Sequence, residues 1–313
     1  MASSLVFVSR PSFPRQQFVT LLDLAARDQL IPDGPELTIQ TSDERLVAKV
    51  CHVAGSREQL QQRATEFVDS HVKAGIVSYA DLCVAVVPEE LTSASQLLLL
   101  MDVDSTLIKQ EVIELLAAHA GREKEVAEVT EAAMRGELDF AQSLIQRVAT
   151  LKDLPDSVLK DVGDRIILSD GAPDLVRRFH AAGHKVAVVS GGFQQILDPL
   201  AKTLSLDHAL ANTLGITDGV LDGTVHGEIV DRQMKETKLR AWSEAHDIPL
   251  NATIAAGDGA NDLDMVSAAG LGIAFNAKPA LRDKADVRLD FGRLDVIADL
   301  VLDDLSQSIP TTR

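Results

Sequence analysis

The chain has 313 residues, and 30 Lys and Arg against 47 Asp and Glu give it a net charge of −17 at pH 7. A chain of this length can bury a large core and fits two domains. The acidic balance argues against nucleic acid or an anionic membrane surface as a partner, so an anionic substrate would need a local cluster of positive groups.

Neither export nor membrane insertion is expected. The apolar stretches fall short of the roughly 20 residues that a spanning helix needs. Residues 5–8 are apolar but Arg10 follows, which is too short a stretch for a secretory signal. Cys51 and Cys83 each lie in an apolar run typical of a strand, so we expect small buried core residues rather than a disulfide or a nucleophile. These features predict a cytoplasmic protein.

The first part of the chain shows alternating strand and helix patterns in the order βαββαβ, which is the ferredoxin-like order. Through residue 92 it carries 8 basic and 12 acidic residues and no catalytic cluster. We expect residues 1–92 to form a regulatory or oligomerising domain, with a purely stabilising extension as the alternative, and residues 88–95 to be the linker. The patterns predict strands at 4–8, 36–40, 45–53 and 81–87 and helices at 16–27 and 58–73.

A wholly apolar run at 97–101 then ends abruptly in two carboxylates, Asp102 and Asp104. The run is typical of a strand buried on both faces, and the carboxyl edge of a parallel sheet is where open α/β folds bind ligands. Turn and helix-capping roles are the alternative for such residues. Two neighbouring acids repel each other unless a cation lies between them, and oxygen ligands suit Mg²⁺. A calcium loop does not fit, because its Gly and Glu positions hold Leu107 and Ile113.

After Asp104 the pattern becomes helical, and four helices between two strands are too many for a simple crossover. We expect a helical cap over the site at about 110–170. Beyond it, strands alternate with helices, which predicts an α/β fold with a doubly wound parallel sheet in residues 93–313. The cap helices are expected at 110–120, 124–134, 140–151 and 156–162. The later strands are expected at 185–189, 208–212, 252–256 and 271–275, the helices at 193–202, 235–246, 261–268 and 293–304, and an antiparallel flap at 220–230.

Two later strands also end in reactive residues. Ser190-Gly191-Gly192 offers a hydroxyl and approachable backbone amides to a phosphate, although alone it is an ordinary turn. Asp258 would add a third carboxylate to the cation, or it is part of an Asp-Gly turn. Lys235 would offset charge on a nucleophile and a phosphoryl group, although most such lysines are solvated. Together they favour phosphoryl transfer, with Asp102 as nucleophile and Asp104 as general acid and then base.

These four segments, in this order, resemble the four motifs of the haloacid dehalogenase-like phosphatases: Asp102-Val103-Asp104-Ser105-Thr106, Ser190-Gly191-Gly192, Lys235, and Gly257-Asp258-Gly259-Ala260-Asn261-Asp262. The resemblance implies that Ser190, the Gly191 amide and Asn261 bind phosphate. It also implies that Asp102, the Asp104 carbonyl and Asp258 bind Mg²⁺. Lys235 would support the phospho-aspartate with Asp262 orienting it, and Lys238 one turn later is its alternative.

The predicted cap resembles the phosphoserine phosphatase branch of this family over about residues 97–304, in the segments Asp-Val-Asp-Ser-Thr-Leu-Ile-Lys-Gln-Glu, Ala-Met-Arg-Gly-Glu-Leu-Asp-Phe and Gln-Ser-Leu-Ile-Gln-Arg-Val. The resemblance implies that Glu111 holds a substrate ammonium, that Arg147 holds its carboxylate, and that Met134 and Phe140 close over it. Exposed helix charges and core packing are the alternatives for these four residues.

The implied reaction is Mg²⁺-dependent hydrolysis of O-phospho-L-serine through an aspartyl-phosphate, the last step of serine biosynthesis. The alternatives are hydrolysis of another small phosphomonoester, transfer of the phosphoryl group to an amino-acid hydroxyl, and a catalytically idle regulator. The βαββαβ order of residues 1–92 resembles the ACT domains attached to enzymes of amino-acid metabolism. This second resemblance implies an amino-acid effector, and an oligomerising role of residues 1–92 would make a homodimer. The acidic balance predicts no nucleic acid and no membrane as partners.

Overall fold

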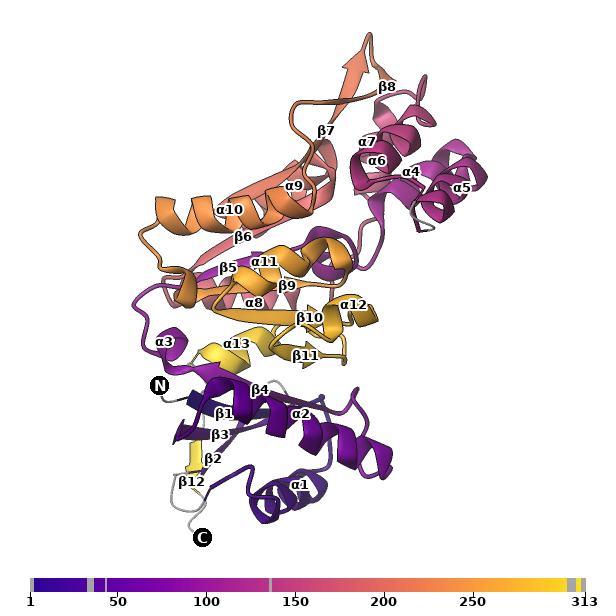
Figure 1. The fold of residues 1–313 in the computed structure, drawn as a ribbon. Helices are drawn as coiled ribbons and strands as arrows, with labels where there is room; N and C mark the ends of the chain where they lie inside the picture. The colour runs from indigo at the N-terminus through magenta and orange to yellow at the C-terminus, as the bar shows by residue number, and fades with distance from the viewer. Residues whose placement is uncertain (1–2, 33–36, 43, 135–136, 303–307, 311–313) are drawn as a thin grey trace.

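The computed structural model describes residues 3–32, 37–42, 44–134, 137–302 and 308–310. The elements form an elongated stack, with an N-terminal sheet at one end, a second sheet in the middle, and a group of helices and a hairpin at the other end (Figure 1). Among the described helices, none combines the length and the apolar character needed to cross a membrane.

The N-terminal module is an antiparallel sheet in the order β12-β2-β3-β1-β4, and its first six elements confirm the predicted βαββαβ order. One face is covered by α1 and α2, whose Phe18 and Phe67 pack with Phe7 of β1 in a separate apolar core. A short C-terminal strand, which the sequence did not predict, pairs with β2. The elements are β1 (Ser3–Ser9), α1 (Arg15–Arg27), β2 (Leu37–Ser42), β3 (Arg45–Val53), α2 (Arg57–Lys73), β4 (Leu82–Pro88) and β12 (Ser308–Pro310).

The two cysteines behave differently from each other. Both are free, and Cys83 on β4 is buried as predicted, but Cys51 on β3 is exposed, so its predicted burial is wrong. The register of β1 against β3 shifts beside Cys51, because Ser3 pairs with Val53 whereas Leu5 pairs with Val50. Such a bulge redirects the side chains of the longer strand, which a simple alternating pattern does not reveal.

The other face of the N-terminal sheet packs on the second sheet's module through α13 (Val296–Val301), so that Val6 and Val47 belong to the main core of the molecule. Arg45 of β3 is fully buried in this interface, and its Nη2 atom lies 2.8 Å from a carboxylate oxygen of both Asp295 and Asp299. The two modules are therefore joined by apolar packing and by a buried group of charges.

The segment predicted as the linker, 88–95, runs between β4 of the first module and β5 (Leu98–Met101) of the second, and it is not extended throughout. It contains the helical turn α3 (Glu89–Thr92), in which Leu91 is buried in the main core. Leu91 fixes this segment to the core. One apolar residue in a short polar stretch shows no periodicity, so its burial could not be predicted from the sequence.

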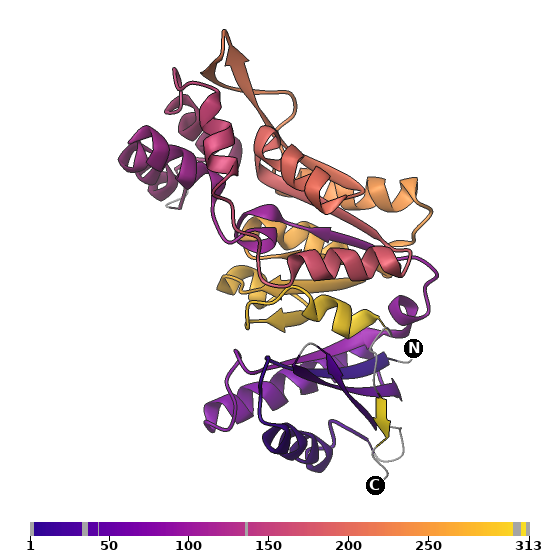
Figure 2. The same ribbon diagram turned by 180° about the vertical axis from the view of Figure 1, so that it is seen from behind.

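The second sheet has the order β11-β10-β9-β5-β6-β7-β8, with parallel pairs except for the β7–β8 hairpin, so the predicted doubly wound α/β fold is confirmed. Two opposite views show α10 and α11 on one face and α8 on the other (Figures 1 and 2). The four residues of β5 are all buried at the centre. The strands are β5 (Leu98–Met101), β6 (Lys185–Phe193), β7 (His208–Thr217), β8 (Val220–His226), β9 (Thr253–Gly257), β10 (Leu271–Phe275) and β11 (Val287–Leu289).

Several helices of this module were missed or have different bounds. The sequence did not predict α8 or α12, and the last described helix, α13, is shorter than the predicted 293–304, of which residues 303 and 304 lie outside the described part. The proline near the start of α8 was the available signal, because proline is favoured in the first helical turn. The helices not yet given are α8 (Ala172–Ala181), α9 (Gln194–Leu204), α10 (Arg232–Ala245), α11 (Leu263–Ala268) and α12 (Pro279–Arg282).

The predicted four-helix cap is inserted between β5 and β6. A short irregular turn, η1 (Val103–Leu107), leads into it. The chain enters and leaves the cap side by side, because Ile108 pairs antiparallel with Leu168 and the Lys109 amide donates to the Ile167 carbonyl at 2.9 Å. The cap helices are α4 (Val112–Ala120), α5 (Glu123–Met134), α6 (Phe140–Ala149) and α7 (Ser157–Gly163).

The β7–β8 hairpin extends from the edge of the sheet to this cap (Figure 1). The Leu221 amide donates to the Leu154 carbonyl at 2.8 Å, and the Asp153 amide donates back to the Leu221 carbonyl at 2.9 Å. The Asp156 amide also donates to the Gly219 carbonyl at 2.9 Å. The cap is therefore joined to the sheet module by backbone hydrogen bonds through the hairpin as well as by its stalk, and its helix α7 packs on α9.

Candidate active site

The site lies where three neighbouring parallel strands end. The central strand β5 has β6 on one side and β9 on the other, so the residues after their carboxyl ends converge. Asp102 follows β5 and is 3% exposed, and its amide donates to the Ala256 carbonyl of β9 at 2.9 Å. Ser190 of β6 and Asp258 after β9 are also buried at this edge. The predicted convergence of Asp102, Ser190 and Asp258 is present.

Lys235 lies beneath Asp102 and is fully buried. Its Nζ atom lies 2.7 Å from Asp102 Oδ1 and 2.7 Å from Asp262 Oδ1. Burial alone would lower the pKa of Lys235, but the two carboxylates raise it above its usual value, so the ammonium stays charged. Burial and the charge of Asp262 raise the pKa of Asp102, against the opposing effect of the lysine. Lys235 makes these contacts rather than Lys238, the alternative left by the sequence.

Asp262 braces the loop after β9. Its Oδ2 atom accepts the amides of Asp258 and Gly259, each at 3.1 Å, while Oδ1 accepts Lys235. A side chain at Gly257 would clash, because a Cβ atom there would lie 2.4 Å from the Asp262 carboxyl carbon. Both oxygens of Asp262 are thus engaged within the protein.

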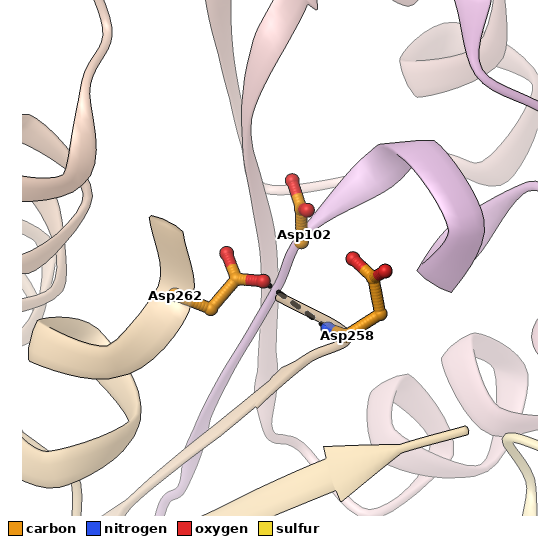
Figure 3. A group of neighbouring side chains, drawn as sticks. All are labelled: Asp102, Asp258 and Asp262. Carbon is orange, nitrogen blue, oxygen red and sulfur yellow. Dashed lines mark hydrogen bonds between the residues drawn. The ribbon is translucent and has the colours of Figure 1, made fainter. Parts of the chain in front are cut away.

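Asp102, Asp258 and Asp262 form an acidic cluster in which one carboxylate oxygen from each residue lies within 4.8 Å of the other two (Figure 3). Because Asp262 is engaged with the loop and with Lys235, Asp102 and Asp258 are the carboxylates that keep oxygens for a cation. Burial raises the pKa of Asp258, which a bound cation would offset. Buried carboxylate oxygens are the donors that Mg²⁺ prefers, so the residues fit this metal.

Asp104 connects the sheet to the cap. Its Oδ1 atom accepts the Val112 amide at 2.9 Å and its Oδ2 atom accepts the Ser190 hydroxyl at 3.2 Å. Burial and the negative charge of Glu111 raise the pKa of Asp104 to about 6, although both hydrogen bonds oppose the shift. A carboxyl group with this pKa can give and take a proton near neutral pH.

The glycines after Ser190 allow close approach of other groups. A Cβ atom on Gly191 would lie 2.9 Å from the Phe140 ring of the cap, and one on Gly192 would lie 2.7 Å from Asp104 Oδ2. The Gly192 amide donates to the Ser190 hydroxyl oxygen at 2.8 Å. The motif is therefore tightly enclosed, which an ordinary surface turn would not be.

A cavity of about 540 Å³ separates the sheet edge from the cap. Asp102, Asp104, Asp258 and Asn261 line it from below. Glu111, Phe140 and Arg147 line it from the cap. Ser143, Thr130, Glu114, Leu138 and Lys278 also line it. The sequence assigned no role to any of them, although Leu138 and Ser143 lie within the two cap segments quoted above, whereas Glu114, Thr130 and Lys278 belong to no motif.

The two predicted charged residues of the cap face this cavity. Glu111 Oε1 accepts the Ser105 hydroxyl at 2.7 Å. Arg147 donates through Nε to the Ser143 carbonyl at 3.3 Å. Burial lowers the pKa of Arg147, against the charges of Glu111 and Asp104. The side chain of Met134, the fourth predicted cap residue, lies outside the described part.

The haloacid dehalogenase-like hydrolase family model matches residues 99–267, more than half of the chain. The chain belongs to this family. The hydrolase is 55% identical over 214 residues to a phosphoserine phosphatase from Streptomyces coelicolor, covering 68% of this chain and 52% of that one. It thus spans about half the length of that relative. It is also 53% identical over 192 residues to the phosphoserine phosphatase of Streptococcus thermophilus, covering 61% of this chain and 89% of that one.

Solved structures extend the likeness of this hydrolase to its N-terminal module. A probable phosphoserine phosphatase from Vibrio cholerae, in unliganded form, has a TM-score of 0.76 and 34% identity, covering 96% of this chain and 86% of that one. A hydrolase of the same family from Salmonella enterica has a TM-score of 0.83 and 26% identity, covering 96% and 100%. The predicted resemblance to the phosphoserine phosphatases of this family is therefore confirmed.

Proposed function

We propose that this hydrolase converts O-phospho-L-serine and water to L-serine and phosphate, with Mg²⁺ as its metal. The observation that carries the proposal is one cavity with phosphoryl-transfer residues on its floor and a carboxylate and a guanidinium in its cap. The phosphoserine phosphatases among its relatives support the same substrate.

The cap residues match the two charges of an amino acid. The Glu111 carboxylate would hold the substrate ammonium, and the fork-shaped guanidinium of Arg147 would hold its carboxylate. Phe140, which lies against Gly191, would cover the bound substrate, and Met134 is proposed to act with it. The phosphate would then lie at Ser190, the Gly191 amide and Asn261.

Asp102 and Asp104 would carry out the two steps of the reaction. An oxygen of Asp102 attacks phosphorus, the bond from phosphorus to the serine oxygen breaks, and Asp104 gives its proton to the leaving oxygen. Water then attacks the aspartyl-phosphate, Asp104 takes a proton from it, and the bond to Asp102 breaks to release phosphate. A pKa of about 6 suits Asp104 to both steps.

Lys235 and the acidic cluster balance charge in these steps. Lys235, held by Asp102 and Asp262, would stabilise the phosphoryl group on Asp102. Asp102, the Asp104 backbone carbonyl and Asp258 would hold Mg²⁺. When bound, the metal neutralises phosphoryl oxygens and orients the group for in-line attack.

We also propose a role and a compartment for the whole chain. Residues 1–92 would act as a regulatory or oligomerising domain and residues 93–313 as the phosphatase. An amino-acid effector and a homodimer stay predictions. The two free thiols fit a reducing compartment, so we place the reaction in the cytoplasm, as the last step of serine biosynthesis.

The decisive experiment measures phosphate release from O-phospho-L-serine, with Mg²⁺ and with EDTA, against a panel of sugar and nucleotide monophosphates. We expect release that needs Mg²⁺ and is selective for phosphoserine. The variant Asp102→Asn, purified in the same way, controls for contaminating phosphatases. Turnover of other phosphoesters without phosphoserine would contradict the proposed roles of Glu111 and Arg147, and no turnover of any phosphoester would contradict the proposed reaction.

A further inference from the structure

Lys278 has a fixed backbone and an exposed side chain at the rim of the cavity. Its amide donates to the Asp258 carbonyl at 2.8 Å, and Pro279 follows it at the start of α12. Proline restricts the residue before it to extended conformations, and Lys278 has φ −63° and ψ 153°. Its side chain is nevertheless 70% exposed. The backbone thus holds this lysine beside the loop of Asp258 while the ammonium can move.

The ammonium of Lys278 lies 3.4 Å from Asp258 Oδ2. Among the described residues that line the cavity, the only other cation is Arg147, which belongs to the cap. Lys235 lies deeper, between Asp102 and Asp262. Lys278 is therefore the cation that the sheet module itself presents to the cavity, and it is paired with a carboxylate that the proposed function assigns to the metal.

A carboxylate oxygen that faces an ammonium is less attractive to a second cation. Mg²⁺ binds carboxylate oxygens at about 2.0–2.1 Å and repels a neighbouring ammonium. The lysine would have to withdraw from Asp258 when the metal binds, and its four-carbon stem allows this because the side chain is exposed. The withdrawn ammonium would still lie at the cavity rim, where a phosphate dianion enters.

We propose that Lys278 is a positioning residue that occupies Asp258 in the metal-free protein, is displaced by Mg²⁺, and then attracts the substrate phosphate to the cavity. The second step rests on the proposed function, whereas the first rests only on Asp258 as a metal ligand. Lys278 thus couples metal loading to phosphate binding, because the ammonium is released only when the metal is in place.

The test titrates Mg²⁺ into metal-free full-length protein by calorimetry, in the wild type, Lys278→Gln and Lys278→Arg. We expect Lys278→Gln to bind Mg²⁺ about twofold to fivefold more tightly, as for loss of one exposed ion pair, and Lys278→Arg to bind as the wild type does. Lys160→Gln is the matched control, because it removes another exposed lysine paired with an aspartate, on α7 and away from the cavity. It should leave Mg²⁺ affinity unchanged.

The direction in which the Mg²⁺ affinity of Lys278→Gln changes distinguishes a competing cation from a residue that only supports the Asp258 loop. Damage to the Asp258 loop would weaken Mg²⁺ binding, whereas removal of a competing cation strengthens it. In Mg²⁺-loaded protein, Lys278→Gln should also bind inorganic phosphate more weakly, with a difference that shrinks as KCl is raised. Equal or weaker Mg²⁺ binding by Lys278→Gln would overturn the proposal. If that variant folds poorly, Lys278→Met replaces it, and equal or weaker binding there has the same meaning.

The titration requires no phosphoserine, so it is independent of the substrate proposed above. Failure to hydrolyse phosphoserine, together with tighter Mg²⁺ binding by Lys278→Gln, would contradict the proposed substrate and keep the role of Lys278 toward the metal. Normal hydrolysis of phosphoserine by the wild type, together with unchanged Mg²⁺ affinity in Lys278→Gln, would support the proposed substrate and contradict the role of Lys278.

Discussion

Replacing Asp104 with asparagine should abolish turnover and yet stabilise the metal-free protein at neutral pH. The pKa of Asp104 is raised from 3.8 to about 6 in the folded protein, chiefly by burial. Below pH 3.8 the group is protonated in both the folded and the unfolded chain, so it does not change the free energy of unfolding. As the pH rises from 3.8 to about 6, the unfolded chain releases this proton while the folded chain keeps it, so stability falls over this range and the loss is complete above it. A shift of about two units corresponds to at most about 3 kcal/mol.

Asparagine is neutral at every pH and can accept the Val112 amide as Asp104 does. Urea unfolding in EDTA at pH 7.5 should therefore show Asp104→Asn more stable than the wild type by about 1–3 kcal/mol, and at pH 4 the difference should largely vanish. Added Mg²⁺ should reduce the gain, because a nearby cation favours the ionised carboxyl group. Asp218→Asn, at an exposed hairpin turn with φ +50°, is the control.

Urea unfolding of Asp104→Asn at pH 7.5 and pH 4 can also show that ionisation of Asp104 does not limit stability. A variant that is less stable than the wild type by the same amount at both pH values would mean that the hydrogen bonds of Asp104 outweigh the cost of ionising it. An equal gain for Asp104→Asn and Asp218→Asn would mean that the overall negative charge, and not the buried position, decides the effect.

Three further substitutions test the site and the joint between the modules. Asp102→Asn should abolish phosphate release from all substrates, and retained turnover would exclude Asp102 as the nucleophile. Arg147→Ala should raise the KM for phosphoserine at least about tenfold while sparing aryl phosphates, as expected for a lost charged hydrogen bond, and equal losses on both would exclude its role with the carboxylate. Arg45→Ala should lower the free energy of unfolding by about 2 kcal/mol in urea, because it removes the cation that Asp295 and Asp299 share and leaves each paired with another arginine, Arg293 and Arg178 respectively. A loss below about 1 kcal/mol would show that these two arginines compensate for it.

The parts of the site that the sequence predicted share one physical signal. A strand buried on both faces must be apolar, so polar residues such as Asp102, Ser190 and Asp258 at its end stand out against the apolar run. Parallel strands then bring such ends together without any knowledge of loop structure. A different signal, the periodicity of apolar residues, predicted the βαββαβ order of the N-terminal module and the helical nature of the cap.

The features that were missed depend on contacts between distant residues. Arg45 and Asp299 are 254 residues apart, and nothing local marks either as half of a buried pair. Lys278 lies on a turn between a strand and a one-turn helix, where periodic patterns are too short to read. Cys51 turns outward because of a bulge, which changes one register step and not the composition of the strand.

The double attachment of the cap restricts how substrate can enter. A cap joined only at its stalk would swing as a single hinged body. Here such a swing would break the three backbone hydrogen bonds to the β7–β8 hairpin, at a net cost of about 0.5–1.5 kcal/mol each. A cheaper movement keeps those bonds and carries the hairpin with the cap, bending where β7 leaves the sheet. The opening rate would then depend on the stiffness of a strand far from the stalk, and substitutions in β7 could slow product release without touching any residue of the cavity.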